Sequence, residues 1–460
     1  MKTVKIPIEL QKMHAIFKRN GFEAYLVGGA VRDSLLGKKI SDYDVTTNAT
    51  PSQVMQIFNK VIPTGIEHGT VTVLFLGQQV EVTTFRTETD YTDGRHPNSI
   101  NFTSKIDDDL SRRDFTINAM AASLETGEVI DLFSGKKDLE EKIIRTVGNP
   151  LERFTEDGLR PIRAIRFSTQ LNFTIEDATF AAISQTMEII QKISIERFRD
   201  EFTKILSSTK PSKGLFLLQK TGILSFFIPE LAQAQGIIQR DFREFHTFDV
   251  FEHCLYACDG ATQNNIILRL AALFHDIGKV QAKKVQITDG KKLFTFYNHE
   301  KYSTTITNTI LTRLKYPKAI IQKVCHLIEN HMFHYEETWT DAAIRRFIVK
   351  IGKENIDDIL LLRKADVFGK TNSFETLNCP HWQKKHQEFV ERLESELQKD
   401  NARSLKDLHI NGNDLIQNGI PSGKKIGVIL NTLFEEVTND PTKNSRDYLM
   451  KKALELHRLM

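Results

Sequence analysis

The chain has 460 residues, a length that favours two to four domains over a single hydrophobic core. Hydrophobic residues make up 40% and charged residues 26%, as in ordinary globular proteins, and no run of about 18 apolar residues predicts a membrane-spanning helix. The formal net charge of +3 is close to neutral, so overall charge does not indicate a nucleic-acid-binding protein and any such binding must rest on local basic patches.

The N-terminal residues and the cysteines indicate the compartment. Met1 to Leu10 has no apolar signal-peptide stretch, and the four cysteines form neither a CxxC pair nor a disulfide framework. We therefore expect a cytoplasmic protein with no membrane association. Strand signals fade after Asn149-Pro150 and amphipathic helical patterns follow, so an α+β fold with a mixed head and a helical body is predicted.

The first predicted strand, Ala24–Val27, ends in two adjacent glycines, Gly28 and Gly29, and a helix is expected to open at Val31. Glycines let the backbone approach a phosphate chain closely, and the free N–H groups of a helix start favour phosphate binding. The turn is therefore a candidate phosphate-binding site.

Two aspartates, Asp42 and Asp44, stand two residues apart on a second short predicted strand, so their side chains project from one face. Two carboxylates beside a phosphate-binding turn are suited to Mg²⁺ ions that carry a nucleoside triphosphate. Such ions would activate an attacking hydroxyl and neutralise the leaving pyrophosphate. The alternative for this pair is a solvated turn.

A hairpin is predicted from Val71–Leu76 and Gln79–Phe85. Glu81 lies between two valines on its second strand, and a charge in that position seldom lacks a partner. Glu81 is a candidate third carboxylate near the metal pair, and a cross-strand salt bridge is the alternative. The polar stretch from Arg86 to Asp109 is predicted to be a mobile loop.

Two arginine-rich segments follow. In Arg112–Ala119, guanidinium groups can bind triphosphate oxygens bidentately and Asp114 can accept a hydrogen bond from a ribose hydroxyl. In Glu156–Phe167, an aspartate and three arginines recur every three residues and would form one ridge of a helix that can read the edge of a base. The alternatives are a surface salt-bridge cluster and a helix with i, i+3 ion pairs.

A second group of candidate residues contains imidazoles and carboxylates, the ligands that a divalent metal takes in a hydrolytic site. An adjacent His275-Asp276 pair follows the apolar run Ile266–Phe274. Further candidates flank it, namely His253 upstream and His299, His331 and Asp366 downstream.

The ordered motifs GGxVRD, DxD, RRDFTINAM and EDxxRxxR resemble the class II tRNA nucleotidyltransferase family, which includes CCA-adding enzymes and bacterial poly(A) polymerases. The resemblance is dense over residues 20–205 and returns in Leu408–Leu415 and Gly423–Gly427. It implies a nucleotidyltransferase head (1–148), an all-helical neck with the nucleotide-selecting motif (149–235), an HD domain (236–375) and a C-terminal helical body and tail that binds tRNA (376–460).

The resemblance implies roles for single residues. Asp42 and Asp44, with Glu81, would be catalytic and hold Mg²⁺, while Asp157 and Arg160 would pair with the incoming base. The implied nucleotide-binding residues are Gly28, Gly29, Arg32, Asp33, Arg113, Asp114, Asn118, Asp157, Arg160, Arg163 and Arg166. Pro161 departs from the pattern, because proline inside a helix removes an N–H and disfavours helical geometry at the preceding Arg160.

The family's activity would be the addition of C and A to tRNA 3′ ends from CTP and ATP. The stretch from Arg86 to Asp109 resembles the family's flexible loop, and its full length argues against an enzyme that adds only C. The alternatives are an A-adding enzyme or poly(A) polymerase and, from another class, a catalytically inactive RNA-binding protein. The sequence leaves the oligomeric state open.

The H…HD…H…H…D series resembles the HD metal-dependent phosphohydrolase family. By this resemblance, one metal ion would be bound by His253, His275, Asp276 and Asp366, and a second by His299 and His331. The metal would be Mg²⁺, Mn²⁺, Ni²⁺ or Fe²⁺, Lys279 would hold a phosphate, and phosphate monoesters or 2′,3′-cyclic phosphates would be the substrates. The alternative is a degenerate domain that serves only as scaffold.

Overall fold

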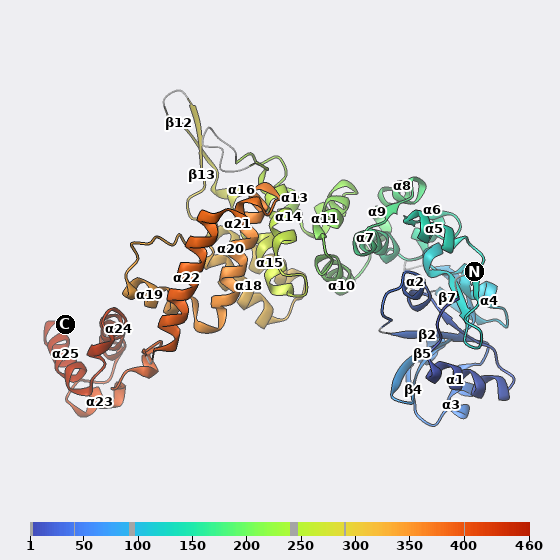
Figure 1. Ribbon diagram of the computed structural model, residues 1–460, viewed down its shortest axis with the longest axis horizontal. Coiled ribbons are helices and arrows are strands. Elements are labelled where there is room, and N and C mark those ends of the chain that lie inside the picture. Colours follow the sequence, from blue (N-terminus) through green and yellow to red (C-terminus); the bar gives the residue numbers. More distant parts are fainter. Residues whose placement is uncertain (1–2, 41, 92–96, 240–246, 289–290, 400) are drawn as a thin grey trace. The chain divides into compact units, whose positions relative to one another are not determined.

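A computed structural model describes residues 3–40, 42–91, 97–239, 247–288, 291–399 and 401–460. The chain divides into two compact units, Met1–Pro229 and Glu230–Met460 (Figure 1). The finer division into four domains stays a prediction.

The first unit is built on one seven-stranded sheet with the strand order β3-β4-β5-β2-β1-β8-β9. Its strands are β1 (Ala24–Val27), β2 (Tyr43–Thr47), β3 (Val61–Gly65), β4 (Thr70–Phe75), β5 (Gln78–Thr84), β8 (Met120–Ser123) and β9 (Val129–Asp131). All neighbours are antiparallel except β2 and β5, which run parallel. The predicted first strand and the predicted β4–β5 hairpin are confirmed.

Alternating valines explain which face of the sheet is buried. Val71 and Val73 on β4 and Val80 and Val82 on β5 are all nearly inaccessible to solvent, so these side chains form the core face. Helices complete the packing around the sheet, namely α1 (Ile8–Arg19), α2 (Gly29–Leu35), α3 (Pro51–Ile57), α4 (Ile106–Ser111) and α5 (Gly135–Glu141). Glu81 has the opposite orientation to its valine neighbours and is thereby available to a site.

The polar stretch after the sheet differs from the prediction. Much of the expected loop is an antiparallel ribbon of β6 (Arg86–Tyr91) and β7 (Pro97–Phe102), followed by α4. Residues 92–96 of the expected loop lie outside the described residues. Most residues of the ribbon are polar, and the apolar Ile100 and Phe102 are too few to show the sustained hydrophobic alternation that signals a strand.

The rest of the first unit is mostly helical, as expected. Its elements are α6 (Pro150–Glu156), α7 (Leu159–Leu171), α8 (Asp177–Gln185), α9 (Met187–Ile190), α10 (Ile195–Leu206), α11 (Pro211–Lys220), α12 (Ile223–Phe227) and the short strands β10 (Ile143–Ile144) and β11 (Thr174–Ile175). Phe198, Phe202 and Ile205 bury one face of α10, which packs against α7.

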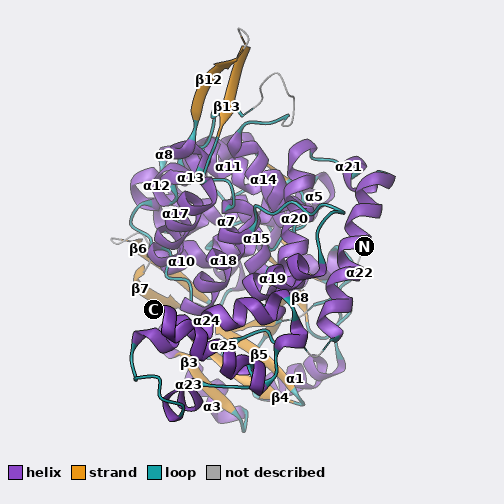
Figure 2. Ribbon diagram, turned by 90° about the vertical axis from the view of Figure 1, so that its left-hand side faces the viewer, coloured by secondary structure: helices purple, strands orange, loops and turns teal. Residues whose placement is uncertain are grey.

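The second unit begins with a helical body. Its elements are α13 (Pro229–Ala232), α14 (Val250–Gly260), α15 (Ile266–Phe274), α16 (Lys279–Ala282), α17 (His299–Arg313), α18 (Lys318–Asn330), α19 (Asp341–Ile351), α20 (Ile356–Thr371) and α21 (Glu375–Asn378). One hairpin, β12 (Lys284–Thr288) with β13 (Lys291–Thr295), projects from these helices (Figure 2). This hairpin was not predicted from the sequence.

Helices α14 and α20 approach each other closely, and glycine makes this possible. A Cβ atom at Gly369 would lie 2.8 Å from the backbone nitrogen of Ala257 and 2.9 Å from the carbonyl oxygen of His253. No larger residue fits there without a shift of the backbone.

The C-terminal part has a small core of its own. It contains α22 (Pro380–Gln398), α23 (Gly412–Gln417), α24 (Lys424–Asn439) and α25 (Arg446–Leu459). Leu415, Ile429, Leu433 and Leu449 are fully buried there. The predicted fold class, a mixed α+β head followed by a mainly helical body and tail, is confirmed.

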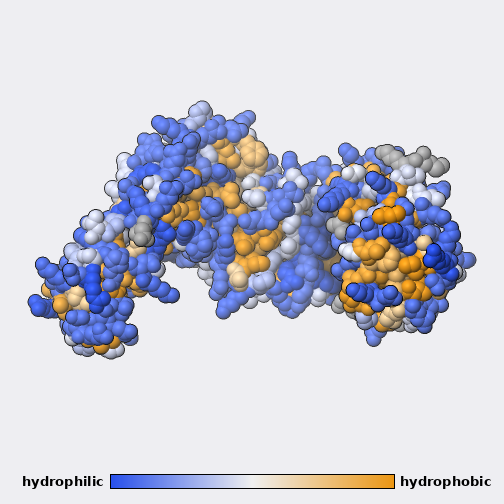
Figure 3. Space-filling view, turned by 60° about the horizontal axis from the view of Figure 1, so that its bottom comes forward, coloured by the Kyte–Doolittle hydropathy of each residue, from blue (hydrophilic) through white to orange (hydrophobic). Residues whose placement is uncertain are grey.

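Polar side chains cover much of the face in Figure 3, with apolar patches between them. Among the described residues, every helix falls short of the length and apolar character that crossing a bilayer requires.

Candidate functional sites

Three carboxylates meet where β2 runs parallel to β5. Asp44 on β2 lies directly opposite Glu81 on β5 in the strand register, and Asp42 comes just before β2. Because neighbouring strands lie about 4.8 Å apart and Asp42 and Asp44 share a face, the three side chains form one group, here called the head carboxylates.

Burial and a neighbouring carboxylate raise the pKa of Asp44 and of Glu81. Partial burial and the negative charge of Asp42 raise the pKa of Asp44, against the opposing effect of Arg113. Partial burial and Asp44 likewise raise the pKa of Glu81, against Arg86. Their mutual repulsion is relieved by a bound cation, and an all-carboxylate oxygen donor set fits Mg²⁺.

The glycine turn lies against this group. Gly28 has a φ of 65° and precedes α2, and a Cβ atom there would be 3.0 Å from Nη1 of Arg113 and 3.9 Å from Oδ2 of Asp44. Glycine therefore satisfies the left-handed conformation and leaves room for the guanidinium beside the carboxylates. The turn, Arg113 and Asp44 are brought together, and Gly29 follows as the first residue of α2.

A buried carboxylate that the sequence analysis missed holds Arg113 in place. Asp109 accepts hydrogen bonds from Arg113 (3.1 Å) and Arg112 (2.7 Å). Burial alone would raise its pKa, but the two arginines lower it below the ordinary value. Asp109 precedes these arginines by three and four residues, which is the spacing of helical ion pairs and the signal that could have found it.

A hydrogen-bond chain joins three of the four motifs. Arg32 donates to Asn118 (2.6 Å) and to Asp33 (2.9 Å), Asn118 donates to Asp114 (3.1 Å), and Arg163 donates to Asp114 (2.8 Å). Burial opposes the charged form of Asp114, but Arg163 and Asn118 lower its pKa to about 2. Residues far apart in sequence therefore form one polar network with Asp114 ionised at its centre.

The expected base-reading residues have separate partners. The Asp157 carboxylate accepts two hydrogen bonds from Arg197 on α10, at 3.0 and 2.9 Å. Arg160 is buried and donates to Glu156 and to the carbonyl oxygens of Arg153 (3.0 Å) and Arg112 (3.2 Å). Arg197 was missed because it lies forty residues downstream on another helix, with no local spacing signal.

Pro161 causes no kink in the base-reading segment. Helix α6 ends at Glu156 and α7 begins at Leu159, so Pro161 lies in the first turn of α7, where a backbone N–H has no helical acceptor. Asp157 occupies the break between the two helices.

Arg166 is mostly engaged within the protein. It pairs with Glu201 of α10, donates to Gln170 (3.0 Å) and lies 3.9 Å from the ring centre of Phe167. It is 9% exposed, and burial lowers its pKa. These contacts fix α7 against α10 behind the Asp114 network.

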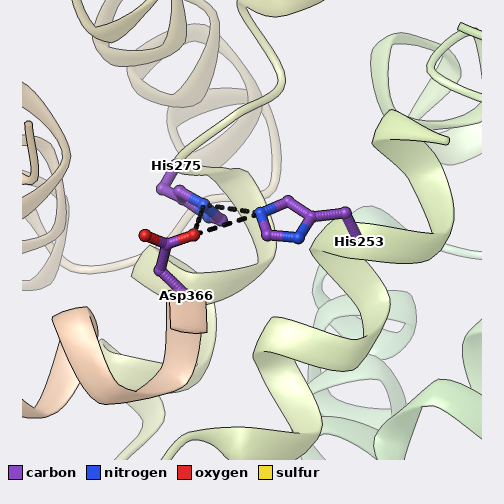
Figure 4. Close-up of side chains that lie close together, drawn as sticks. All are labelled: His253, His275 and Asp366. Carbon is purple, nitrogen blue, oxygen red and sulfur yellow. Dashed lines mark hydrogen bonds and ion pairs between the residues drawn. The ribbon is translucent and has the colours of Figure 1, made fainter. Parts of the chain in front are cut away.

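The second unit brings all six predicted HD residues together, here called the histidine cluster. Figure 4 shows His253 of α14, His275 at the end of α15 and Asp366 of α20 turned toward one another. The Nε2 atoms of His253 and His275 are 3.1 Å apart, and Oδ1 of Asp366 lies 3.4 and 3.6 Å from them. Donors on one tetrahedral ion with bonds of about 2.1 Å lie about 3.4 Å apart, so this group fits a metal ion.

Asp276 joins this group to a second one. Its Oδ2 atom lies 3.1 Å from Nε2 of His253, whereas its Oδ1 atom lies 3.1 Å from Nε2 of His299 and 3.6 Å from Nε2 of His331. His299 and His331 are themselves 3.4 Å apart at Nε2. One carboxylate thus faces two pairs of imidazoles, one with each oxygen.

Backbone carbonyl oxygens orient three of the imidazoles. The Nδ1 atom lies 2.9 Å from Ala272 O in His275, 2.8 Å from Phe296 O in His299 and 2.6 Å from Ile328 O in His331. A carbonyl only accepts, so Nδ1 carries a proton and Nε2 is the nitrogen that faces the cluster. With Nε2 deprotonated, this is the tautomer that a metal-binding imidazole adopts.

The charge of the cluster also favours a cation. Burial disfavours a charged imidazole, yet Asp276 and Asp366 raise the pKa of His275 to about 10. Against the effect of their own burial, the pKa values of both carboxyls are held well below the ordinary range by charged neighbours, His275 for Asp276 and Lys370 for Asp366. A divalent ion would supply this positive charge in exchange for protons.

The cluster opens onto a cavity of about 570 Å³ with basic side chains in its wall. Lys279 contacts Asp276 (2.6 Å) and Gln239 (2.9 Å), and Arg363 contacts Asp366 (2.9 Å). Lys370 also lines the cavity. Lys279 was expected there, whereas Arg363 and Lys370 were missed, although both lie one turn of α20 from Asp366.

Three family models match segments of the chain. Residues 24–145 match the poly A polymerase head domain, and residues 292–453 match tRNA nucleotidyltransferase domain 2. Residues 172–235 match a segment described as an RNA and SrmB-binding site of polymerase A. The fold and the head site thus define a nucleotidyltransferase.

Relatives that match over nearly the whole chain show which nucleotidyltransferase family it belongs to. A CCA-adding enzyme of Ligilactobacillus salivarius is 34% identical over 98% of both chains, and one of Levilactobacillus brevis is 33% identical over 98% of this chain and 99% of the other. The crystal structure of the Bacillus stearothermophilus CCA-adding enzyme in complex with CTP is 28% identical, covers 98% of this chain and 97% of that one, and has a TM-score of 0.74. The chain belongs to the CCA-adding enzyme family of tRNA nucleotidyltransferases.

Proposed function

We propose that the head adds C and A to tRNA 3′ ends from CTP and ATP, with Asp42, Asp44 and Glu81 as its metal-holding residues. The observation that carries this assignment is the register of β2 against β5, which sets Asp44 opposite Glu81. The glycine turn and Arg113 lie directly beside them.

Each head residue has a defined task in nucleotide addition. Mg²⁺ bound by the head carboxylates would activate the terminal ribose hydroxyl and neutralise charge on the phosphates. Arg113 and Arg32, with Gly28 and Gly29, bind the triphosphate, and Asp114 accepts from the ribose. The ribose oxygen bonds the α-phosphorus, the bond to pyrophosphate breaks, and the hydroxyl proton passes to solvent or a carboxylate.

Base selection is assigned to Asp157 and Arg160. A carboxylate and a guanidinium together offer acceptors and donors to the polar edge of C or A. Arg197 orients Asp157, and Glu156 orients Arg160, so both groups are held before the base arrives. Arg163 and Arg166 support this arrangement from α7.

The test is incubation with three tRNAs, which lack the whole CCA end, the last two nucleotides or only the final A. CTP and ATP are supplied separately. A CCA-adding enzyme extends all three. Extension only of the tRNA that lacks the final A would identify an A-adding enzyme, and untemplated A tails would identify a poly(A) polymerase.

A second candidate function is metal-dependent phosphate ester hydrolysis at the histidine cluster. The observation that favours it is Asp276, which faces two imidazole pairs beside a basic cavity. Such a site fits Mg²⁺, Mn²⁺, Ni²⁺ or Fe²⁺ and phosphate monoesters or 2′,3′-cyclic phosphates. Water oxygen bonds phosphorus, a phosphorus–oxygen ester bond breaks, and the leaving oxygen takes up a proton.

Hydrolysis of such esters by the purified chain with each metal tests this second function. Metal analysis of the same sample provides an independent measurement. We place both functions in the cytoplasm.

A further inference from the structure

The hairpin of β12 and β13, which projects from the helices of the second unit, concentrates positive charge (Figure 2). Residues 283–292 contain four lysines and one aspartate, a net charge of +3, which equals the formal net charge of the whole chain. The rest of the chain is therefore close to neutral, and this segment, here called the basic hairpin, is a local basic patch of the kind that binds a polyanion.

The lysines of the basic hairpin lie on both of its faces. Lys284 pairs with Thr295 across the ladder, and Lys292 pairs with Ile287. Direct partners in an antiparallel ladder share a face, and successive residues along a strand alternate between faces. Lys284 and Lys291 therefore lie on one face of the ribbon, and Lys292 lies on the other.

The ammonium groups near the outer part of the basic hairpin face solvent. Lys284, Lys291 and Lys292 are exposed, and among the described residues no carboxylate pairs with Lys284 or Lys292. Lys283 differs, because it donates to the carbonyl oxygen of Ile238 and lies 4.3 Å from the ring centre of Phe294. Lys283 thus fixes the base of the hairpin, whereas Lys284 and Lys292 can reach an anionic partner without breaking an existing ion pair.

Two aliphatic side chains stand beside these lysines. Val285 is 56% exposed and Ile287 is 76% exposed, and both share the face of Lys292. An RNA backbone alternates charged phosphates with ribose rings that present C–H surface. Lysine next to valine and isoleucine offers a matching alternation of positive charge and apolar surface.

We propose that the basic hairpin binds the phosphate backbone of a duplex arm of tRNA. The inference rests on the proposed addition of C and A to tRNA, and it assigns part of tRNA binding to a surface outside the head. A ribbon with lysines on both faces can contact the two phosphate chains that border one groove of a duplex. Phosphate contacts carry no sequence information, which suits an enzyme that must accept tRNAs of different sequence.

An anionic lipid surface is the other polyanion that a basic hairpin with exposed aliphatic residues could meet. Elements that lie on a membrane gather apolar residues on one face and basic residues on the opposite face. In the basic hairpin, Lys292 shares the face of Val285 and Ile287, and this face could not enter the lipid without its charge. RNA therefore fits better, and binding to vesicles becomes an outcome of the test.

The first test measures affinity for tRNA as a function of salt. The double variant Lys284→Gln with Lys292→Gln is titrated with labelled tRNA that lacks the final A, without nucleotide, in KCl of increasing concentration. Loss of two phosphate contacts is expected to lower the slope of log Kd against log salt by about 1.4–1.8 and to raise Kd about 25- to 60-fold in ~0.1 M KCl. An RNA stem-loop of unrelated sequence should show the same loss of affinity.

The matched control is Lys318→Gln with Lys353→Gln, which removes two exposed lysines of the same unit. The control should change the slope and Kd far less, and circular dichroism should show that both variants are folded. An unchanged Kd in the hairpin variant, an equal loss in the control, or a loss confined to one of the two RNAs overturns the proposal. Binding of the unaltered chain to phosphatidylserine vesicles that the hairpin variant loses, with tRNA affinity unchanged, would identify a membrane surface instead.

The second test separates this inference from the proposed function. In the addition of A to the same tRNA, the hairpin variant should raise the KM for tRNA by a similar factor and leave kcat and the KM for ATP unchanged. Extension of tRNA by the unaltered chain, with the same KM for tRNA in the hairpin variant, overturns the hairpin and leaves nucleotide addition standing. No extension by the unaltered chain overturns nucleotide addition, and the salt titration then decides on RNA binding by itself.

Discussion

The two candidate metal sites of the molecule differ in burial and in ligand chemistry. The head carboxylates lie at a sheet surface, where Asp42 is exposed and Asp44 half-buried. All six residues of the histidine cluster are buried, and four of them are imidazoles. Mg²⁺ is usually held by one or two carboxylates together with substrate phosphates, whereas imidazole-rich cages retain a transition metal without substrate.

The difference teaches what each site must do. An open carboxylate group can receive its metal with a nucleoside triphosphate and admit the end of a large RNA. An enclosed cluster would hold a metal ion between turnovers and admit only what fits its cavity. Variants that disable one site should therefore leave the other intact.

The largest effect is expected at the head. Asp44→Ala removes a carboxylate that faces both Glu81 and Arg113, and nucleotide addition should fall roughly 1,000-fold or more because metal stabilisation supplies several kcal/mol. Addition of A to tRNA ending in CC measures it, and circular dichroism should show an unchanged fold. Glu128→Ala, which removes an exposed carboxylate in the same unit, is the control. Near-normal addition by Asp44→Ala would contradict the assignment of Asp44 as a metal-holding residue.

Asp276→Asn should affect the other site alone. Because each oxygen of Asp276 faces one imidazole pair, the change should weaken metal binding and phosphohydrolase activity at least about 100-fold while CCA addition persists. Metal content by mass spectrometry and ester hydrolysis are the measurements. The exposed His409→Ala serves as control, and full metal content in Asp276→Asn would refute the bridging role.

Base selection should show an intermediate effect. Arg160→Ala or Asp157→Ala leaves the polar edge of the incoming base unpaired, which costs about 1–3 kcal/mol. We therefore expect a change of about 5- to 150-fold, either in the preference between CTP and ATP or in the kcat/KM for both nucleotides. tRNA affinity should stay unchanged. Kinetics with each nucleotide and a tRNA-binding assay decide, with Arg199→Ala on α10 as the control. Unchanged nucleotide choice and KM would place base selection elsewhere.

The smallest effect concerns stability in acid. Arg163 and Asn118 lower the pKa of buried Asp114 from 3.8 to about 2, so ionised Asp114 stabilises the fold above pH 3.8 and this contribution is lost as the pH falls toward 2. Asp114→Asn should lower the free energy of unfolding by about 2 kcal/mol at pH 5. It should also make the free energy of unfolding fall less steeply between pH 4 and 2. Denaturant unfolding across this pH range measures it. Parallel curves for the two proteins would contradict the pKa shift.

Strong local signals made much of the fold predictable. The bounds of β1 and α15 follow from apolar runs with clear ends, and the β4–β5 hairpin follows from alternating valines around a glycine turn. The β6–β7 ribbon was missed because its residues are polar and carry no period. Hydrophobic pattern finds elements that bury a face and passes over those that do not.

The candidate sites could be predicted as sets of residues and not as contacts. The motifs contain Asp44, Asp114 and Asp276, but Arg197 lies on a different helix from its partner Asp157 and has no spacing signal. Which oxygen of Asp276 faces which imidazole depends on the packing of α14, α15, α17 and α18, and a single sequence does not encode that in any local pattern.

The close approach of α14 and α20 at Gly369 has a consequence for metal selectivity. His253 and Asp366 lie on these two helices, and the missing side chain at Gly369 lets the backbones meet beside the His253 carbonyl. The separation of the two ligands is therefore set by main chain against main chain, which yields far less than side-chain rotamers do. We expect this close approach to fix how far apart His253 and Asp366 lie, and so to limit the size of a metal ion that they would hold together.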